Sequence, residues 1–191
     1  MATPKYRRIT IHGHSGSGKS RLAHIIGARL NLSVIELDAL YHVNNWHDTP
    51  LDEFRAKIER ITESSPNGWI SAGNYFRVKD LLMDQADVVV WLRLPFHIVY
   101  WRLLWRTIRD LFTKKPIWEG GALIESWKQT FATQDSILLW GIKHWKPHIR
   151  GMTAALDTTP EDVTILILRS SRAVNDFVNQ LPQINHDSSD G

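Results

Sequence analysis

Gly13–Ser20 has the sequence GHSGSGKS and follows directly after Arg8–His12 (RITIH), a short segment rich in β-branched residues. It matches the phosphate-binding pattern G-x-x-x-x-G-K-S/T at every position. Glycines let such a loop bring its backbone N–H groups close to a phosphate, and the helix that follows points its N-terminus at the anion. Lys19–Leu30 has the apolar spacing of that helix. The segment therefore predicts a strand, a phosphate-binding loop and a helix, in this order.

The residue types in the loop predict a site for ATP and Mg²⁺. Lys19 is expected to reach the β- and γ-phosphates, and the Ser20 hydroxyl to bind Mg²⁺. The other loop residues are expected to surround the phosphate groups; they are Gly13, His14, Ser15, Gly16, Ser17 and Gly18.

The rest of the chain alternates between short apolar segments and helical patterns. Four segments have the composition of further strands: Ser33–Leu37, Trp69–Ala72, Val88–Leu94 and Val163–Leu168. Nearly continuous apolar strands that alternate with helices predict a parallel sheet covered on both faces. We therefore expect a three-layer α/β sandwich with a five-stranded parallel sheet. It forms one domain over residues 1–181, with a lid within about 106–125 and a polar tail at 182–191.

Composition narrows the function classes. The chain has 191 residues, 43% of them hydrophobic, and no cysteine, which excludes disulfides and thiolate metal sites. The polar N-terminus has no secretory pattern, and no apolar run is long enough to span a bilayer. These features predict a cytoplasmic protein. The net charge of +3 is spread along the chain and is only weak evidence for a nucleic-acid partner.

A second site is expected near Asp38, at the carboxyl end of the second strand, because ligands bind at that edge of an open parallel sheet. A carboxylate there can take a proton from an acceptor hydroxyl or hold a Mg²⁺-bound water. The loop that follows is polar and aromatic. This suits a pocket for a ring or sugar, with ordinary surface aromatics as an equal alternative. Its residues are Tyr41, His42, Asn44, Asn45 and Trp46.

The third strand ends at the same edge, at Gly73 and Asn74. Asn74 is interpreted either as a hydrogen-bonding partner of the acceptor or as a turn residue. Many proteins with this loop place an acid at the end of another apolar strand to orient Mg²⁺. Here the third and fourth strands end at Ala72 and at Arg93-Leu94. Asp38 is therefore the carboxylate expected near the metal, either as a direct ligand or through a bound water.

Three arginines share one face of the predicted helix Phe96–Phe112, because Arg102, Arg106 and Arg109 follow at i, i+4 and i+7. In phosphoryl transfer such arginines neutralise charge on the transferring group. Arg102 and Arg106 are thus candidate catalytic residues in a lid. A solvated helix face is one alternative. A membrane-surface helix is another, because two tryptophans lie on the same helix.

Gly13–Ser20, Glu36–His42 (ELDALYH) and Gly73-Asn74-Tyr75 together resemble the bacterial family named DNA topology modulation protein FlaR, small relatives of adenylate kinase. The likeness extends over about residues 8–175. It implies an adenylate- or shikimate-kinase-like fold with strand order 2-3-1-4-5 and a short lid. It also implies ATP at the loop, lid arginines at Arg102 and Arg106, and an acceptor site near Asp38. The chain departs from the family at Ala72 and Arg93, where acids are expected.

These features favour an ATP-dependent kinase whose acceptor is a nucleotide, a nucleoside or another small hydroxyl compound. Lys19, Asp38 and the lid arginines would carry the chemistry. The missing acids and the family resemblance leave a second hypothesis, an ATP-dependent regulator linked to DNA with little or no turnover. A peripheral membrane protein is a third, and it rests on the tryptophan and arginine helix alone.

Overall fold

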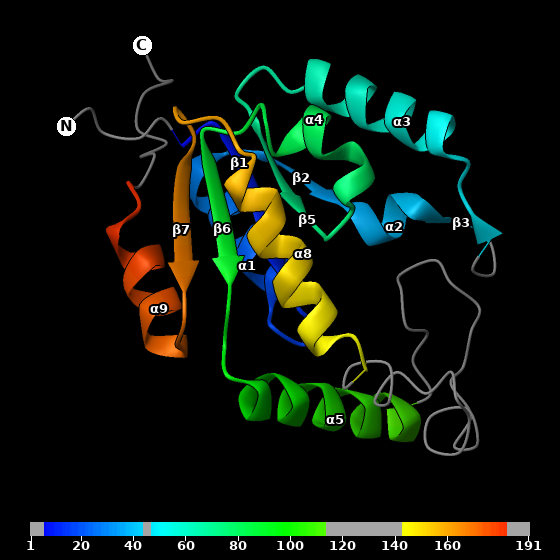
Figure 1. The fold of residues 1–191 in the computed structure, drawn as a ribbon, viewed down its shortest axis with the longest axis vertical. Helices are drawn as coiled ribbons and strands as arrows, with labels where there is room; N and C mark the ends of the chain where they lie inside the picture. The colour runs from blue at the N-terminus through cyan, green and yellow to red at the C-terminus, as the bar shows by residue number, and fades with distance from the viewer. Residues whose placement is uncertain (1–5, 44–46, 114–142, 183–191) are drawn as a thin grey trace, which may run out of the picture.

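Five parallel strands form the centre of the molecule (Figure 1). The computed structural model describes residues 6–43, 47–113 and 143–182. The sheet order is β2-β5-β1-β6-β7. Counted along the chain without the short hairpin, this is the order 2-3-1-4-5, and the α/β prediction is confirmed. The strands are β1 (Arg8–Gly13), β2 (Ser33–Glu36), β5 (Trp69–Ala72), β6 (Val88–Leu92) and β7 (Thr164–Leu168).

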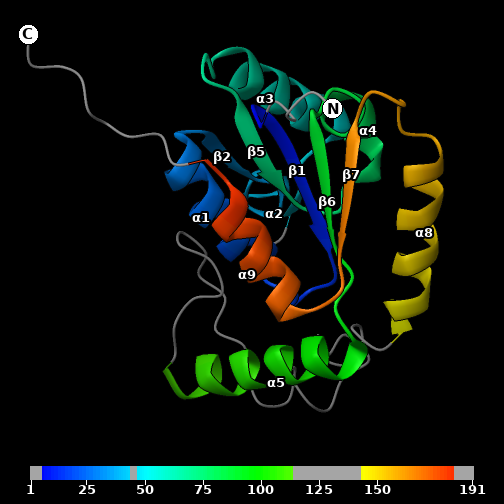
Figure 2. The same ribbon diagram turned by 90° about the vertical axis from the view of Figure 1, so that its left-hand side faces the viewer.

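Helices cover both faces of the sheet (Figure 2). On one face α1 (Lys19–Leu30) and α9 (Ser171–Gln180) pack over Ile9 and Ile11 of β1. On the other face lie α3 (Leu51–Glu63), α4 (Lys79–Leu82) and α8 (Trp145–Asp157). The outer layers explain why β6 is apolar and buried along its whole length.

The remaining described elements lie near the carboxyl ends of the strands. They include α2 (Leu37–Tyr41), the hairpin of β3 (His42–Val43) and β4 (His47–Asp48), and the 3-10 turn η1 (Phe76–Val78). The long helix α5 (Phe96–Thr113) runs across this end of the sheet in both views (Figures 1 and 2). The edge predicted to hold the ligands is therefore bordered by α2, α5 and the first turn of α8.

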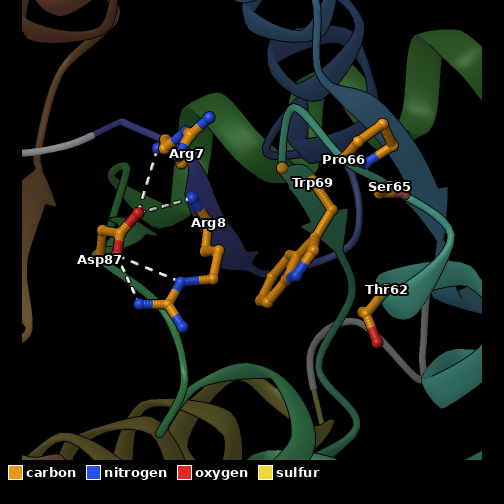
Figure 3. Close-up of a pocket in the computed structure, with 8 residues that line it drawn as sticks. Arg7, Arg8, Thr62, Ser65, Pro66, Trp69 and Asp87 are labelled. Atoms are coloured by element: carbon orange, nitrogen blue, oxygen red, sulfur yellow. Dashed lines mark hydrogen bonds and ion pairs between the residues drawn. The ribbon is translucent and has the colours of Figure 1, made fainter.

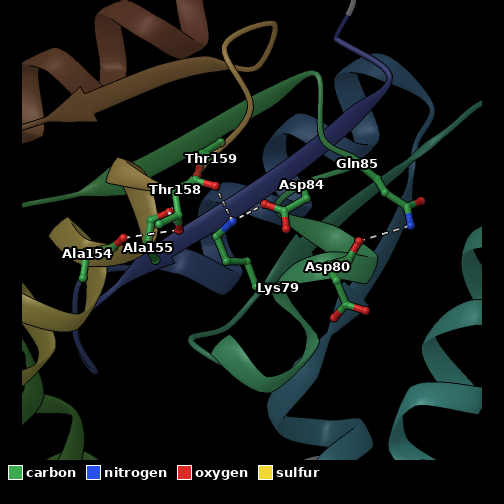
Figure 4. A network of polar contacts seen from close by, with 8 residues as sticks. All are labelled: Lys79, Asp80, Asp84, Gln85, Ala154, Ala155, Thr158 and Thr159. Carbon is green, nitrogen blue, oxygen red and sulfur yellow. Dashed lines mark hydrogen bonds and ion pairs between the residues drawn. The ribbon is translucent and has the colours of Figure 1, made fainter.

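Lys79 links the outer helices at the opposite end of α8. Its ammonium forms an ion pair with Asp84 and donates a hydrogen bond to the carbonyl oxygen of Thr158 over 3.2 Å (Figure 4). Thr158 directly follows α8, and Lys79 begins α4. This contact anchors the C-terminal end of α8, while its N-terminal end points toward the phosphate-binding loop.

The predicted boundaries shift by one or two residues. β2 ends at Glu36, because Leu37 begins α2 and its side chain packs against Gly73, where an added Cβ would lie 2.7 Å from the Leu37 Cβ. β6 ends at Leu92. Residues 106–113 of the predicted lid belong to α5, whereas 114–125 and the tail from 183 onward lie outside the described residues.

Among the described helices, none is long and apolar enough to cross a membrane.

Candidate functional site

The loop between β1 and α1 has the conformation that its glycines predict. Gly16 and Gly18 adopt left-handed φ angles of 84° and 96°, which favour glycine. A Cβ on Gly16 would lie 2.8 Å from the carbonyl oxygen of Val99, so α5 packs directly against the loop. Gly18 instead faces open space and precedes the first residue of α1. The loop is thus held on one side by a helix and open at the helix N-terminus.

Lys19 folds back over the loop. Its Nζ donates hydrogen bonds to the carbonyl oxygens of Gly13 over 2.8 Å and of His14 over 3.4 Å. Burial lowers the pKa of Lys19, the charge of Asp38 opposes that shift, and Arg106 adds to it. A buried ammonium next to another cation is a favourable partner for a phosphate, which would replace the water that burial removes.

Ser20 is joined to a carboxylate that the sequence analysis missed. Its hydroxyl donates a 2.8 Å hydrogen bond to Glu36 Oε2, and Glu36 Oε1 lies 3.0 Å from His24 Nε2. Glu36 is the last residue of β2 and therefore reaches the edge where the loop lies. Its position at the strand end was the available signal. Hydroxyl and carboxylate oxygens are the ligands that Mg²⁺ prefers, so Glu36 joins Ser20 as a candidate.

Asp38 lies in the first turn of α2, half-buried, and its charge is the largest one that raises the pKa of Lys19. The structure thus brings Asp38 to the loop. Tyr41 lies three residues further along the chain. The centroid of its ring is 5.2 Å from that of Phe54 and 4.9 Å from that of Tyr75. His42 begins β3, while Asn44, Asn45 and Trp46 lie outside the described residues.

Asn74 connects two strand ends. Its Oδ1 accepts a hydrogen bond from the Gly13 N–H over 3.1 Å, and its Nδ2 donates one to the Gly13 carbonyl oxygen over 2.8 Å. Both ends of the side-chain amide therefore contact the first residue of the loop. Asn74 therefore positions the loop, a role that neither sequence interpretation named. Gly73, just before it, packs against Leu37.

The structure separates the two candidate lid arginines. Arg102 donates a 2.9 Å hydrogen bond to the Ser171 hydroxyl at the start of α9. Arg106, one turn further along α5, is exposed and close enough to Lys19 to lower its pKa. Arg106 therefore lies within electrostatic range of the loop, while Arg102 is tied to α9. Trp101 and Trp105 on the same helix are 58% and 57% exposed.

Histidines gather beside the loop, and only His14 had been predicted there. His14 packs 4.9 Å from Trp145 and 5.6 Å from His148, both in the first turn of α8. His12, at the end of β1, is 6% exposed. Burial, assisted by the charge of Lys19, lowers the pKa of His12 to about 3. The pKa of His148 is lowered to about 4, mainly by burial and further by the charges of His14 and Lys19.

The described residues also line a cavity of about 310 Å³ at the opposite edge of the sheet (Figure 3). Arg8 begins β1 there and forms a 2.8 Å ion pair with Asp87. Asp87 also accepts hydrogen bonds from the backbone N–H groups of Arg7 and Arg8. Its carboxylate is thus saturated by partners of this chain, and the cavity is separate from the loop. Its other lining residues are Thr62, Ser65, Pro66, Gly68 and Trp69.

Comparison with known proteins agrees with this architecture at the level of the fold. No protein-family model matches the chain, and no curated protein matches its sequence. A solved shikimate kinase from Bacteroides thetaiotaomicron is similar, with 18% identity and a TM-score of 0.51, over 91% of this chain and 95% of that one.

Two more solved structures have lower scores. A shikimate kinase from Acinetobacter baumannii in complex with shikimate has 14% identity, a TM-score of 0.49 and coverage of 93% of this chain and 91% of that one. A gluconokinase from Sinorhizobium meliloti has 15% identity, a TM-score of 0.48 and coverage of 91% and 88%. The fold and the loop together define the class: the chain has a P-loop α/β fold, similar in architecture to the solved shikimate kinase from Bacteroides thetaiotaomicron.

Proposed function

We propose that this protein is a kinase that transfers the γ-phosphoryl group of ATP to a hydroxyl group of a small acceptor. One observation carries the proposal: Lys19, the Ser20–Glu36 pair and Asp38 meet at a single edge of the sheet. A phosphate-binding loop alone indicates a nucleotide site. A further carboxylate beside Lys19 supplies what a transfer reaction needs in addition.

The residues of the loop, together with Glu36, would bind the phosphates of the nucleotide and its Mg²⁺. Lys19 would contact the β- and γ-phosphates, and the loop N–H groups would surround them. Ser20 and Glu36 fit Mg²⁺ because their adjacent oxygens, 2.8 Å apart, are the hard ligands that this ion binds. When bound, Mg²⁺ neutralises phosphate charge.

Asp38 would act on the acceptor. The acceptor oxygen forms a bond to the γ-phosphorus, the bond from that phosphorus to the ADP oxygen breaks, and Asp38 takes the hydroxyl proton. Arg106 would stabilise the negative charge on the transferring group. The acceptor would be a small ring or sugar-like hydroxyl compound, a nucleoside or a nucleotide, bound near Tyr41, His42 and Gly73.

The resemblance to the FlaR family also raised a regulator with little turnover. The regulator hypothesis was based on the absence of acids at Ala72 and Arg93. Arg93 places its guanidinium carbon 5.1 Å from the centre of the Trp91 ring, so it does not replace a carboxylate. Glu36, however, offers the loop an acid from another strand. This contact supports the kinase over the regulator.

The test measures ADP release from ATP and Mg²⁺ against a panel of nucleoside monophosphates, nucleosides and sugar-like alcohols. We expect acceptor-dependent release that Lys19→Ala abolishes. Lys57→Ala serves as the matched control, because Lys57 forms a surface pair with Glu53 on α3, and it should retain full activity. ATP binding without acceptor-dependent release would support the regulator. Unchanged turnover in Lys19→Ala would refute the site.

A further inference from the structure

Two imidazoles lie beside the phosphate-binding loop and have no part in the proposed transfer: His12 is buried and His148 is half-buried. His12 is the penultimate residue of β1. Ile9 and Ile11 face α1, so the alternation along the strand turns His12 toward α8. Its ring stacks on Phe76 with centroids 6.1 Å apart and planes 10° from parallel. Trp91 of β6 is its neighbour in the sheet.

His148 approaches the same place from α8. Its ring lies edge-on to His14, with centroids 5.6 Å apart and planes at 82°. Trp145, one turn earlier, packs against His14 and also against Phe96 of α5 at 5.0 Å. These aromatic contacts hold the first turn of α8 against the loop. They therefore fix the position of His148 beside the site.

Three ring nitrogens of this pair are buried without a hydrogen bond among the residues that the structure describes. Both ring nitrogens of His12 and Nε2 of His148 are buried without a partner. The Gly73 backbone is near enough to favour a charged His12 slightly, but not in hydrogen-bonding geometry. Most buried polar groups are satisfied, so such atoms call for an explanation. A bound anion near these ring nitrogens would provide an explanation, because it would stabilise their protonated form.

The charges around the pair are mainly positive while the loop holds no anion. Lys19 disfavours a charge on both imidazoles, His148 disfavours one on His12, and His14 disfavours one on His148. Burial is the largest cause that lowers the pKa of both rings, so both stay neutral at pH values well below 6.5. Further groups act on Lys19 or His14: Arg106 of α5, His144 just before α8, and the acids Asp38 and Glu36.

We propose that occupation of the loop by nucleotide phosphates drives uptake of a proton by the His12–His148 pair. The anion cancels the repulsion from Lys19 and adds negative charge within a region of low dielectric, which stabilises an imidazolium. The proton comes from the buffer and adds to a ring nitrogen, and no other bond changes. The inference rests on the proposed nucleotide site.

Linkage gives the sign of the effect. Because the loaded protein binds more protons than the empty one, nucleotide affinity rises as the pH falls. The rise begins near the pKa of the pair in the loaded state. It ends once the empty protein is protonated as well. An acidic shift therefore tightens nucleotide binding without any change in the loop itself.

Calorimetry of ATP binding with excess Mg²⁺, at pH 5.5 in buffers that differ in ionisation enthalpy, counts the protons exchanged. The excess Mg²⁺ keeps the phosphates of the nucleotide deprotonated. We expect net uptake in the unaltered protein, reduced uptake in His148→Gln and in His12→Asn, and none in the double variant. His97→Gln is the matched control, an exposed histidine on α5, and should match the unaltered protein.

A second measurement covers the case in which a variant folds poorly. Nitrogen-15 NMR of the imidazoles in the unaltered protein follows the pKa of His148 with and without ATP. We expect an upward shift of at least one unit, a tenfold change. Binding with buffer-independent heat and unshifted imidazoles would overturn this inference and leave the nucleotide site intact. Absence of any ATP binding would overturn the proposed function as well.

Discussion

Glu36 is the carboxylate that forms a hydrogen bond with the first turn of α1, directly after the loop. It accepts a hydrogen bond from Ser20 and contacts His24, one turn further along α1, so its carboxylate is held in place from two sides. Asp38, two residues later, belongs to α2 instead of β2, and its charge raises the pKa of Lys19. Two carboxylates two residues apart thus face different parts of one site. We expect their removal to have different kinetic effects.

Glu36→Gln should raise the Mg²⁺ concentration needed for half-maximal ADP release by about 10–100-fold, because a neutral amide binds the ion less well and no longer orients Ser20. A Mg²⁺ titration at saturating ATP measures this. Glu53→Gln on α3, an exposed residue paired with Lys57, is the control and should be unaffected. An unchanged Mg²⁺ requirement in Glu36→Gln would remove Glu36 from the metal site.

Asp38→Asn should lower kcat by about 10²–10⁴-fold, because the amide cannot accept the acceptor proton. ATP affinity should change far less, since Asp38 is proposed to act on the acceptor. Steady-state kinetics and calorimetry give the two values. Asp176→Asn on the exposed face of α9 is the control. Equal losses of kcat and of ATP affinity would assign Asp38 to nucleotide binding instead.

At the scale of elements, α5 and α8 hold the loop from outside the sheet. Val99 and Leu103 of α5 pack onto Gly16, and Trp145 of α8 packs onto His14. These two helices flank the part of the chain between residues 113 and 143. The loop is therefore positioned by helix packing as well as by its own glycines.

Gly16→Ala should lower the free energy of unfolding by about 1–3 kcal/mol, since its φ of 84° disfavours a side chain and the new Cβ would press on Val99. Gly151→Ala in α8 is the matched control. Its Cβ would lie 3.5 Å from Phe76, an ordinary contact, so helix propensity should leave stability equal or higher by about 0.5–1 kcal/mol. Urea unfolding measures both. Equal effects would contradict the close packing of α5 on the loop.

At the scale of the whole molecule, the free energy of unfolding depends on two imidazoles that are uncharged in the folded protein. The pKa values of His12 and His148 are lowered to about 3 and about 4 in the folded protein from an ordinary value of 6.5. Below about pH 6.5 the unfolded chain therefore binds more protons than the folded one. The stability that these groups contribute is present above pH 6.5 and is lost as the pH falls toward 3.

We expect the free energy of unfolding, followed by urea titration from pH 7.5 to pH 4.5, to fall by up to about 1.4 kcal/mol per pH unit for each histidine that stays neutral. His12→Asn should flatten this dependence, because an amide does not titrate. His97→Gln should leave it unchanged. A pH dependence that is the same in His12→Asn would show that His12 is not buried as a neutral ring.

The sequence predicted the fold and the phosphate-binding loop well. Glycines, β-branched strands and helical spacing act over a few neighbouring residues, so their patterns are visible in one segment. The predicted ends of β2 and β6 were too long by one and two residues, because strand ends depend on packing against residues elsewhere. Leu37, for example, leaves the sheet where it meets Gly73.

By itself the sequence determined the fold class of the protein, a P-loop α/β fold, and it predicted Lys19 and Ser20 at the phosphate site. Only the tertiary structure decided which side chains meet there. It joined Glu36 to Ser20, tied Asn74 to Gly13 and brought His148 of α8 beside the loop. The physical reason is distance along the chain. Such contacts form when crossover helices pack on the sheet, and no local pattern encodes where a distant side chain arrives.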